Sequence, residues 1–184
     1  ISFRYARNLA TGAGLVWNVG ERVEGYTNFL WTLLLAIPFV SSKAAEPVLF
    51  ARVLSIAGGA AAIVGSFLLV RRMAPKSAVL PLVPPLLLAG NWSFAINTMS
   101  GLETVFLAGL TTMAVWLLVV ETEDLRYRGS SVLFALAALT RPEAIGLFVG
   151  MLGLVAWPLP HPYRPEARRY LARLTGPFAA IVGL

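Results

Sequence analysis

The chain of 184 residues is 58% hydrophobic and only 13% charged, whereas an ordinary soluble domain is about 25% charged. It has no cysteine and one histidine, which excludes disulfides, thiolate nucleophiles and metal sites built from clustered cysteines or histidines. The net charge of +6 would suit nucleic acid, but the arginines lie mainly in short loops between apolar runs, so they indicate membrane topology and no nucleic-acid partner.

The first 28 residues are polar and predict an extracytoplasmic loop. Residues 1–11 fit an amphipathic helix in the membrane interface, with Arg4 and Arg7 on its polar face. The apolar segment that follows, 29–40, is shorter than the ~20 residues that span a bilayer. We therefore expect a juxtamembrane helix that does not cross the membrane.

Residues 48–184 predict a series of transmembrane helices. Their apolar runs are continuous and do not alternate, which excludes a β-barrel and leaves an all-α, polytopic bundle. The first span contains glycines and alanines at 57–62 and Gly65, which suit close helix packing. The second span carries three prolines and is expected to be kinked. The predicted spans are 48–70, 78–96, 104–120, 131–140, 143–157 and 175 onward.

Basic residues predict the orientation of these spans. They gather in loops 71–77, 121–130 and 158–173, which the positive-inside rule assigns to the cytoplasm. The segments left for the extracytoplasmic side are 1–28, 97–103 and 140–143. We expect these three pieces of chain to converge on one face.

Three ionisable residues stand at the predicted extracytoplasmic ends of spans. Glu103 lies at the mouth of one span, and Arg141 and Glu143 flank a helix break. Ionisable groups at membrane depth are costly, so they usually pair or serve a function. The structural alternatives are that Arg141 pairs with Glu143 and that Glu103 caps its helix. For Arg4 and Arg7 the alternative is snorkelling to lipid headgroups.

These residue types together suit a lipid-phosphate-linked substrate. Arginine binds phosphate in bidentate geometry, and a carboxylate can act as general base toward a hydroxyl. For the charged residues at 21–24, the alternative interpretation is an ordinary solvated loop. The sequence offers no convincing metal site and no evident cofactor, and a divalent cation stays open as an alternative that no residue pattern here supports.

Three motifs resemble those of bacterial GT-C glycosyltransferases. The first extends through residues 1–9, 14–18 and 20–28, and the others are GLET at 101–104 and TRPE at 140–143. The group is similar to the terminal arabinofuranosyltransferases of mycobacterial cell walls. More distantly, it resembles the aminoarabinose and protein O-mannosyl transferases.

This resemblance implies a multi-pass enzyme of the bacterial inner membrane. Such enzymes transfer a sugar from a polyprenyl-phosphate donor to a glycan or lipid acceptor on the extracytoplasmic side, usually with inversion. In the family an Asp pair stands immediately before the position of Ile1, and one of the two is the expected principal base, which residues 1–184 do not include. We therefore expect residues 1–184 to be the N-terminal part of one GT-C catalytic module, cut at both ends and inactive alone. By resemblance the catalytic residue is Glu103, and the substrate-binding residues are Arg4, Tyr5, Asn8, Arg22, Glu24, Tyr26, Asn28, Arg141 and Glu143.

Two other functions stay open. A transporter or flippase of lipid-linked sugars would need charged residues along a path through the bilayer centre. Arg52 is the one charge inside a predicted span, near its outer end, which disfavours such a path. A non-catalytic membrane assembly subunit is the second alternative.

Overall fold

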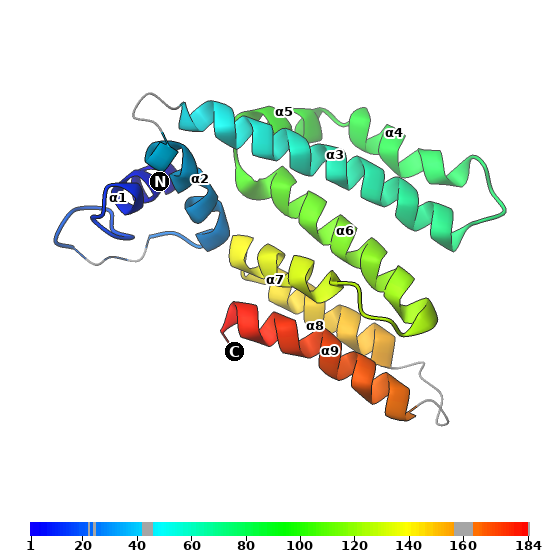
Figure 1. Ribbon diagram of the computed structural model, residues 1–184. Helices are drawn as coiled ribbons and strands as arrows, with labels where there is room; N and C mark the ends of the chain where they lie inside the picture. The colour runs from blue at the N-terminus through cyan, green and yellow to red at the C-terminus, as the bar shows by residue number, and fades with distance from the viewer. Residues whose placement is uncertain (22, 24, 42–45, 157–163, 184) are drawn as a thin grey trace.

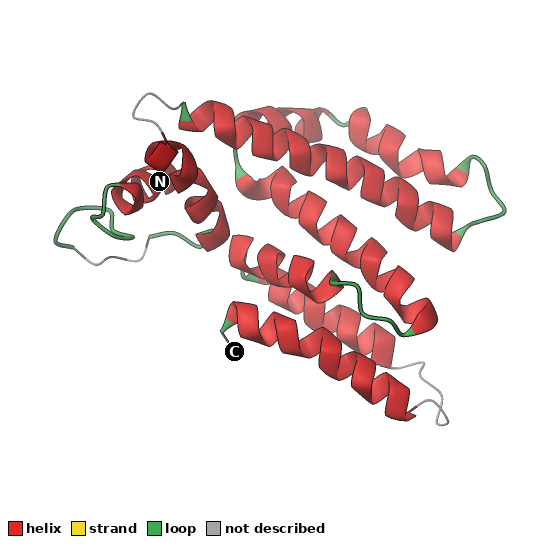
Figure 2. Ribbon diagram, in the orientation of Figure 1, coloured by secondary structure: helices red, strands yellow, loops and turns green. Residues whose placement is uncertain are grey.

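The computed structural model describes residues 1–21, 23, 25–41, 46–156 and 164–183. Within these ranges the chain is all helical and has no strand, which confirms the predicted fold class at that level (Figures 1 and 2). Two of the helices, α3 and α6, are long and apolar enough to cross a bilayer. The elements are α1 (Ser2–Ala10), α2 (Phe29–Ser41), α3 (Pro47–Met73), the 3-10 turn η1 (Leu80–Leu82), α4 (Val83–Ala89), α5 (Trp92–Ser100), α6 (Glu103–Asp124), α7 (Ser130–Thr140), α8 (Glu143–Ala156) and α9 (Arg164–Val182).

Helices α3 and α6 form the central pair, and they run in the same direction. Gly58 faces Phe106 and Gly109. About two turns further along α3, Gly65 faces Met113. A Cβ at Gly58 would lie 2.9 Å from the backbone nitrogen of Phe106, closer than real Cβ atoms come. Glycine is therefore required where these two backbones touch, as the small residues of the sequence predicted.

The return from α3 to α6 is not one kinked helix but three short pieces, η1, α4 and α5. Prolines stand in the first turn of both η1 and α4, where the missing N–H would have no helical partner. The pieces separate again at Gly90 and Asn91. The Asn91 side chain caps α5 by accepting a hydrogen bond of 2.9 Å from the backbone N–H of Phe94.

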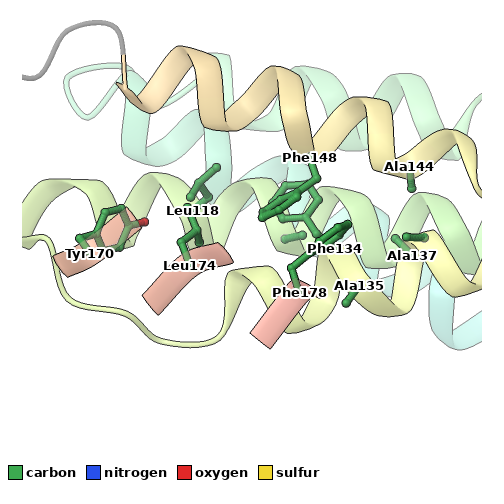
Figure 3. Packing of buried hydrophobic residues seen from close by; sticks show 11 residues of the cluster. Leu118, Phe134, Ala135, Ala137, Ala144, Phe148, Tyr170, Leu174 and Phe178 are labelled. Carbon is green, nitrogen blue, oxygen red and sulfur yellow. The ribbon is translucent and has the colours of Figure 1, made fainter. Parts of the chain in front are cut away.

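Helix α7 packs against the remaining face of α6, and α8 and α9 pack against α7. Their aromatic side chains meet in one cluster, in which the Phe148 and Phe178 rings stack 3.9 Å apart (Figure 3). The break predicted at 140–143 is confirmed, since α7 ends at Thr140 and α8 begins at Glu143. A proline at 142 favours this break because it disfavours helical backbone at the residue before it.

Helix α9 corrects the predicted loop 158–173, because the chain is helical from Arg164 onward. Residues 157–163 lie outside the described residues. Ala167, Tyr170 and Leu174 recur at helical spacing and are buried against the cluster. The exposed arginines of this segment occupy the rest of the helix surface, so basic character and helix formation are compatible here.

The predicted amphipathic helix is confirmed as α1, which packs on α2. Tyr5 and Ala6 of α1 are buried, and Trp31 and Leu35 of α2 lie in the adjoining core. The Trp31 ring lies 5.4 Å from that of Phe106 in α6. Helices α1 and α2 therefore sit at the end of the bundle where α6 begins (Figure 1).

Candidate functional site

Glu103 and Arg141 form an ion pair at this end of the bundle. The guanidinium donates to Oε1 of Glu103 from Nη2 at 2.8 Å and from Nε at 3.1 Å. The Glu103 side chain is 11% exposed and that of Arg141 is 39% exposed. Glu103 is the first residue of α6, and Arg141 has extended backbone just after α7. The pair thus joins two segments that are 38 residues apart.

Asn28 brings the first segment of the chain to the same place. Its side-chain amide lies beside the Glu103 carboxylate. Asn28 also donates to the hydroxyl of Ser2 in α1 at 3.0 Å and accepts from the hydroxyl of Thr32 in α2 at 3.2 Å. The residue is 9% exposed, so these contacts position it firmly.

The three segments predicted to face the extracytoplasmic side therefore meet. The alternative in which Arg141 pairs with Glu143 is wrong, since Arg141 pairs with Glu103. Glu143 is exposed in the first turn of α8, and no ion pair links it to another described residue.

Arg4 is held by the loop that follows α1. Its guanidinium lies 4.4 Å from the Trp17 ring centroid and donates from Nη2 to Oδ1 of Asn18 at 2.6 Å. Asn18 in turn donates to Glu21 at 2.9 Å. The charge of Arg4 stays exposed, but its position is set by this aromatic and amide contact.

Tyr5 and Asn8 fasten the same loop to α1. The Tyr5 hydroxyl donates to the backbone oxygen of Val23 at 2.9 Å, and its ring lies 4.8 Å from that of Tyr26. The Asn8 amide donates to the backbone oxygen of Val16 at 2.7 Å. Both side chains donate hydrogen bonds to the backbone of the loop, so both residues stabilise its conformation. The two remaining predicted residues, Arg22 and Glu24, lie outside the described residues.

A second polar cluster, which the sequence analysis missed, surrounds Glu121 near the opposite end of α6. Glu121 is fully buried. Its Oε1 accepts from the backbone N–H groups of Arg128 and Ser130, at 2.7 and 2.9 Å. Its Oε2 accepts from the Ser130 hydroxyl at 2.7 Å and from the Tyr170 hydroxyl at 3.1 Å. One carboxylate thus joins α6, the following loop and α9.

Burial and the neighbouring Glu121 carboxylate raise the pKa of the Tyr170 hydroxyl well above its usual range. The only sequence signal for the cluster was Glu121 itself, which lies within the predicted basic loop 121–130. In the parts of the chain that the structure describes, no three His, Cys, Asp or Glu side chains gather in a way that could hold a metal ion.

Comparisons of the chain with protein-family models, with curated proteins and with solved structures found no match. The likeness of the motifs at 101–104 and 140–143 to GT-C enzymes therefore stays a prediction. Functional inference depends on the geometry of Glu103, Arg141 and Asn28.

Proposed function

We propose that the chain is part of a multi-pass glycosyltransferase of the bacterial inner membrane. It would move a sugar from a polyprenyl-phosphate donor to a glycan or lipid acceptor on the extracytoplasmic side. The observation that supports this is the meeting of Glu103, Arg141 and Asn28, which come from the three segments that resemble GT-C motifs. In this proposal α3 and α6 cross the bilayer, and the shorter helices complete the bundle around them.

In the proposed reaction Arg141 binds the phosphate of the donor. Its Nε and Nη2 are used by Glu103, while Nη1 has no protein partner among the described residues. The side chain is partly exposed, so Nη1 can donate to a phosphate oxygen and stabilise its growing negative charge. Glu103 orients this guanidinium.

In the proposed reaction an acceptor hydroxyl attacks the anomeric carbon of the sugar. The bond between that carbon and the phosphate oxygen breaks, and the lipid phosphate leaves with the electron pair. A carboxylate takes the proton of the hydroxyl. Oε1 of Glu103 already accepts two hydrogen bonds from Arg141, so Oε2 is the atom of Glu103 assigned this role.

We expect Glu103→Gln and Arg141→Ala each to lower sugar transfer by about 100-fold or more, because each removes a charge that acts on the transition state. The assay uses the natural gene product in membranes with a panel of radiolabelled polyprenyl-phosphate sugars. Melting temperatures of the purified variants separate a loss of chemistry from a loss of folding.

Arg126→Ala is the matched control, because Arg126 is exposed and follows the opposite end of α6. It should leave transfer unchanged. Full activity in both Glu103→Gln and Arg141→Ala would refute the site. Label that crosses the bilayer without transfer would favour a flippase.

A further inference from the structure

The ends of α3 and α6 farthest from Glu103 line an open cavity of about 590 Å³. Its apolar walls are Leu68 of α3 with Trp116 and Val120 of α6. Arg71, Arg72 and Glu123 line it closer to the helix ends. Because a helix rises about 1.5 Å per residue, the apolar walls lie toward the middle of the bundle and the charges lie at the rim.

Among the described residues that line this rim, the positive charges outnumber the negative ones. Arg72 is paired with Glu123 through both Nε and Nη2. The Arg71 guanidinium lies 5.8 Å from the centroid of the Phe67 ring, and no carboxylate of a described residue pairs with Arg71. A neighbouring cavity of about 410 Å³ shares Arg71 and adds Lys76, which likewise has no ion-pair partner among the described residues.

The cavity matches the polarity of an amphiphile, because exposed cations lie outside an apolar slot, the part lined by Leu68, Trp116 and Val120. Two of the cations, Arg71 at the end of α3 and Lys76 in the loop after it, are exposed, and both line the neighbouring cavity. The slot lies between the two helices that are long and apolar enough to span a bilayer, so its apolar part would face acyl chains. Guanidinium and ammonium groups at this level attract anionic headgroups.

We propose that this cavity binds an anionic phospholipid of the adjacent leaflet. The lipid phosphate binds Arg71 and Lys76, and one acyl chain lies along Leu68, Trp116 and Val120. Binding requires that α3 and α6 cross the bilayer, and it does not depend on sugar transfer at Glu103.

The test is native mass spectrometry of the natural gene product in a neutral detergent, titrated with three probes. These are phosphatidylglycerol, phosphatidylcholine and glycerophosphoglycerol, which is the first headgroup without acyl chains. We expect phosphatidylglycerol to bind at least about tenfold more tightly than the other two, because only it offers both a net charge and a chain.

The double variant Arg71→Ala/Lys76→Ala should lose about tenfold or more of this affinity, and Arg71→Lys/Lys76→Arg should keep it. Trp116→Ala should weaken phosphatidylglycerol but not glycerophosphoglycerol. The matched control is Arg126→Ala/Arg168→Ala, which removes two exposed basic residues that do not line the cavity.

Equal binding of phosphatidylglycerol and phosphatidylcholine would overturn the proposal. So would an equal loss of affinity in the control, which would show attraction to basic residues in general. Binding of glycerophosphoglycerol as tight as that of the whole lipid would exclude the apolar slot as the acyl-chain site. Sugar-transfer activity is not measured in this test, so its failure leaves the proposed function unaffected.

Discussion

Gly58→Ala should separate α3 from α6 and lower the free energy of unfolding by about 3 kcal/mol or more, at the upper end of the usual cost of overpacking. The added methyl would lie 2.9 Å from a backbone nitrogen of α6, and a backbone cannot rotate away as a side chain can. Gly109→Ala should act similarly, since its Cβ would lie 2.9 Å from the Gly58 Cα. The measurement is the melting temperature and unfolding free energy of the purified protein in detergent.

Gly146→Ala and Gly150→Ala are matched controls. Both positions lie within α8, and a Cβ there meets nothing within 4 Å. Alanine is the better helix former by about 1 kcal/mol, so these variants should be neutral or slightly more stable. If Gly58→Ala behaved like them, the close approach of α3 and α6 would be wrong.

Glu121→Gln should lower the free energy of unfolding by about 2 to 4 kcal/mol, although it changes neither size nor shape. The buried carboxylate accepts four hydrogen bonds, whereas an amide has one oxygen and one NH₂ group. The amide NH₂ would then face either the two backbone N–H donors or the two hydroxyls, whose hydrogens would lose their acceptor, and either arrangement leaves buried polar groups unsatisfied. Denaturant titration in detergent measures the change.

Glu123→Gln gives the comparison, because it makes the same chemical change two residues further along α6. Glu123 is exposed and pairs with Arg72 at the surface, where such pairs add little to stability. Its variant should unfold at nearly the same denaturant concentration as the wild type. Equal destabilisation by both changes would mean that the buried hydrogen bonds of Glu121 do not cause the loss of stability.

Local sequence features predicted most of the helices. Amphipathic spacing identified α1, and the proline at 142 identified the break between α7 and α8. The division of the 78–96 segment was missed, because three prolines in one apolar run allow a kink as well as separate first turns. The start of α9 was missed because its arginines suggested a loop, whereas the apolar face of Ala167, Tyr170 and Leu174 shows helical spacing.

The site could be predicted residue by residue but not as a set of contacts. Glu103 and Arg141 could be identified because ionisable residues at the ends of apolar helices are costly and usually pair or serve a function. Their pairing depends on how α6 and α7 pack, and a local interpretation links Arg141 to the nearer Glu143. Glu121 could not be identified, since its donors come from a loop and from Tyr170, which lies 49 residues away.

If α3 and α6 cross the bilayer as proposed, their parallel course bears on how the chain is inserted during synthesis. Two parallel spans require the chain between them to cross back, and the three pieces η1, α4 and α5 are each too short to cross alone. In a bilayer their free backbone groups need protein partners, and α3 packs against all three. In the proposed membrane arrangement, η1, α4 and α5 would be held by α3, which is made earlier, and the α3–α6 pair would close only once α6 has left the ribosome.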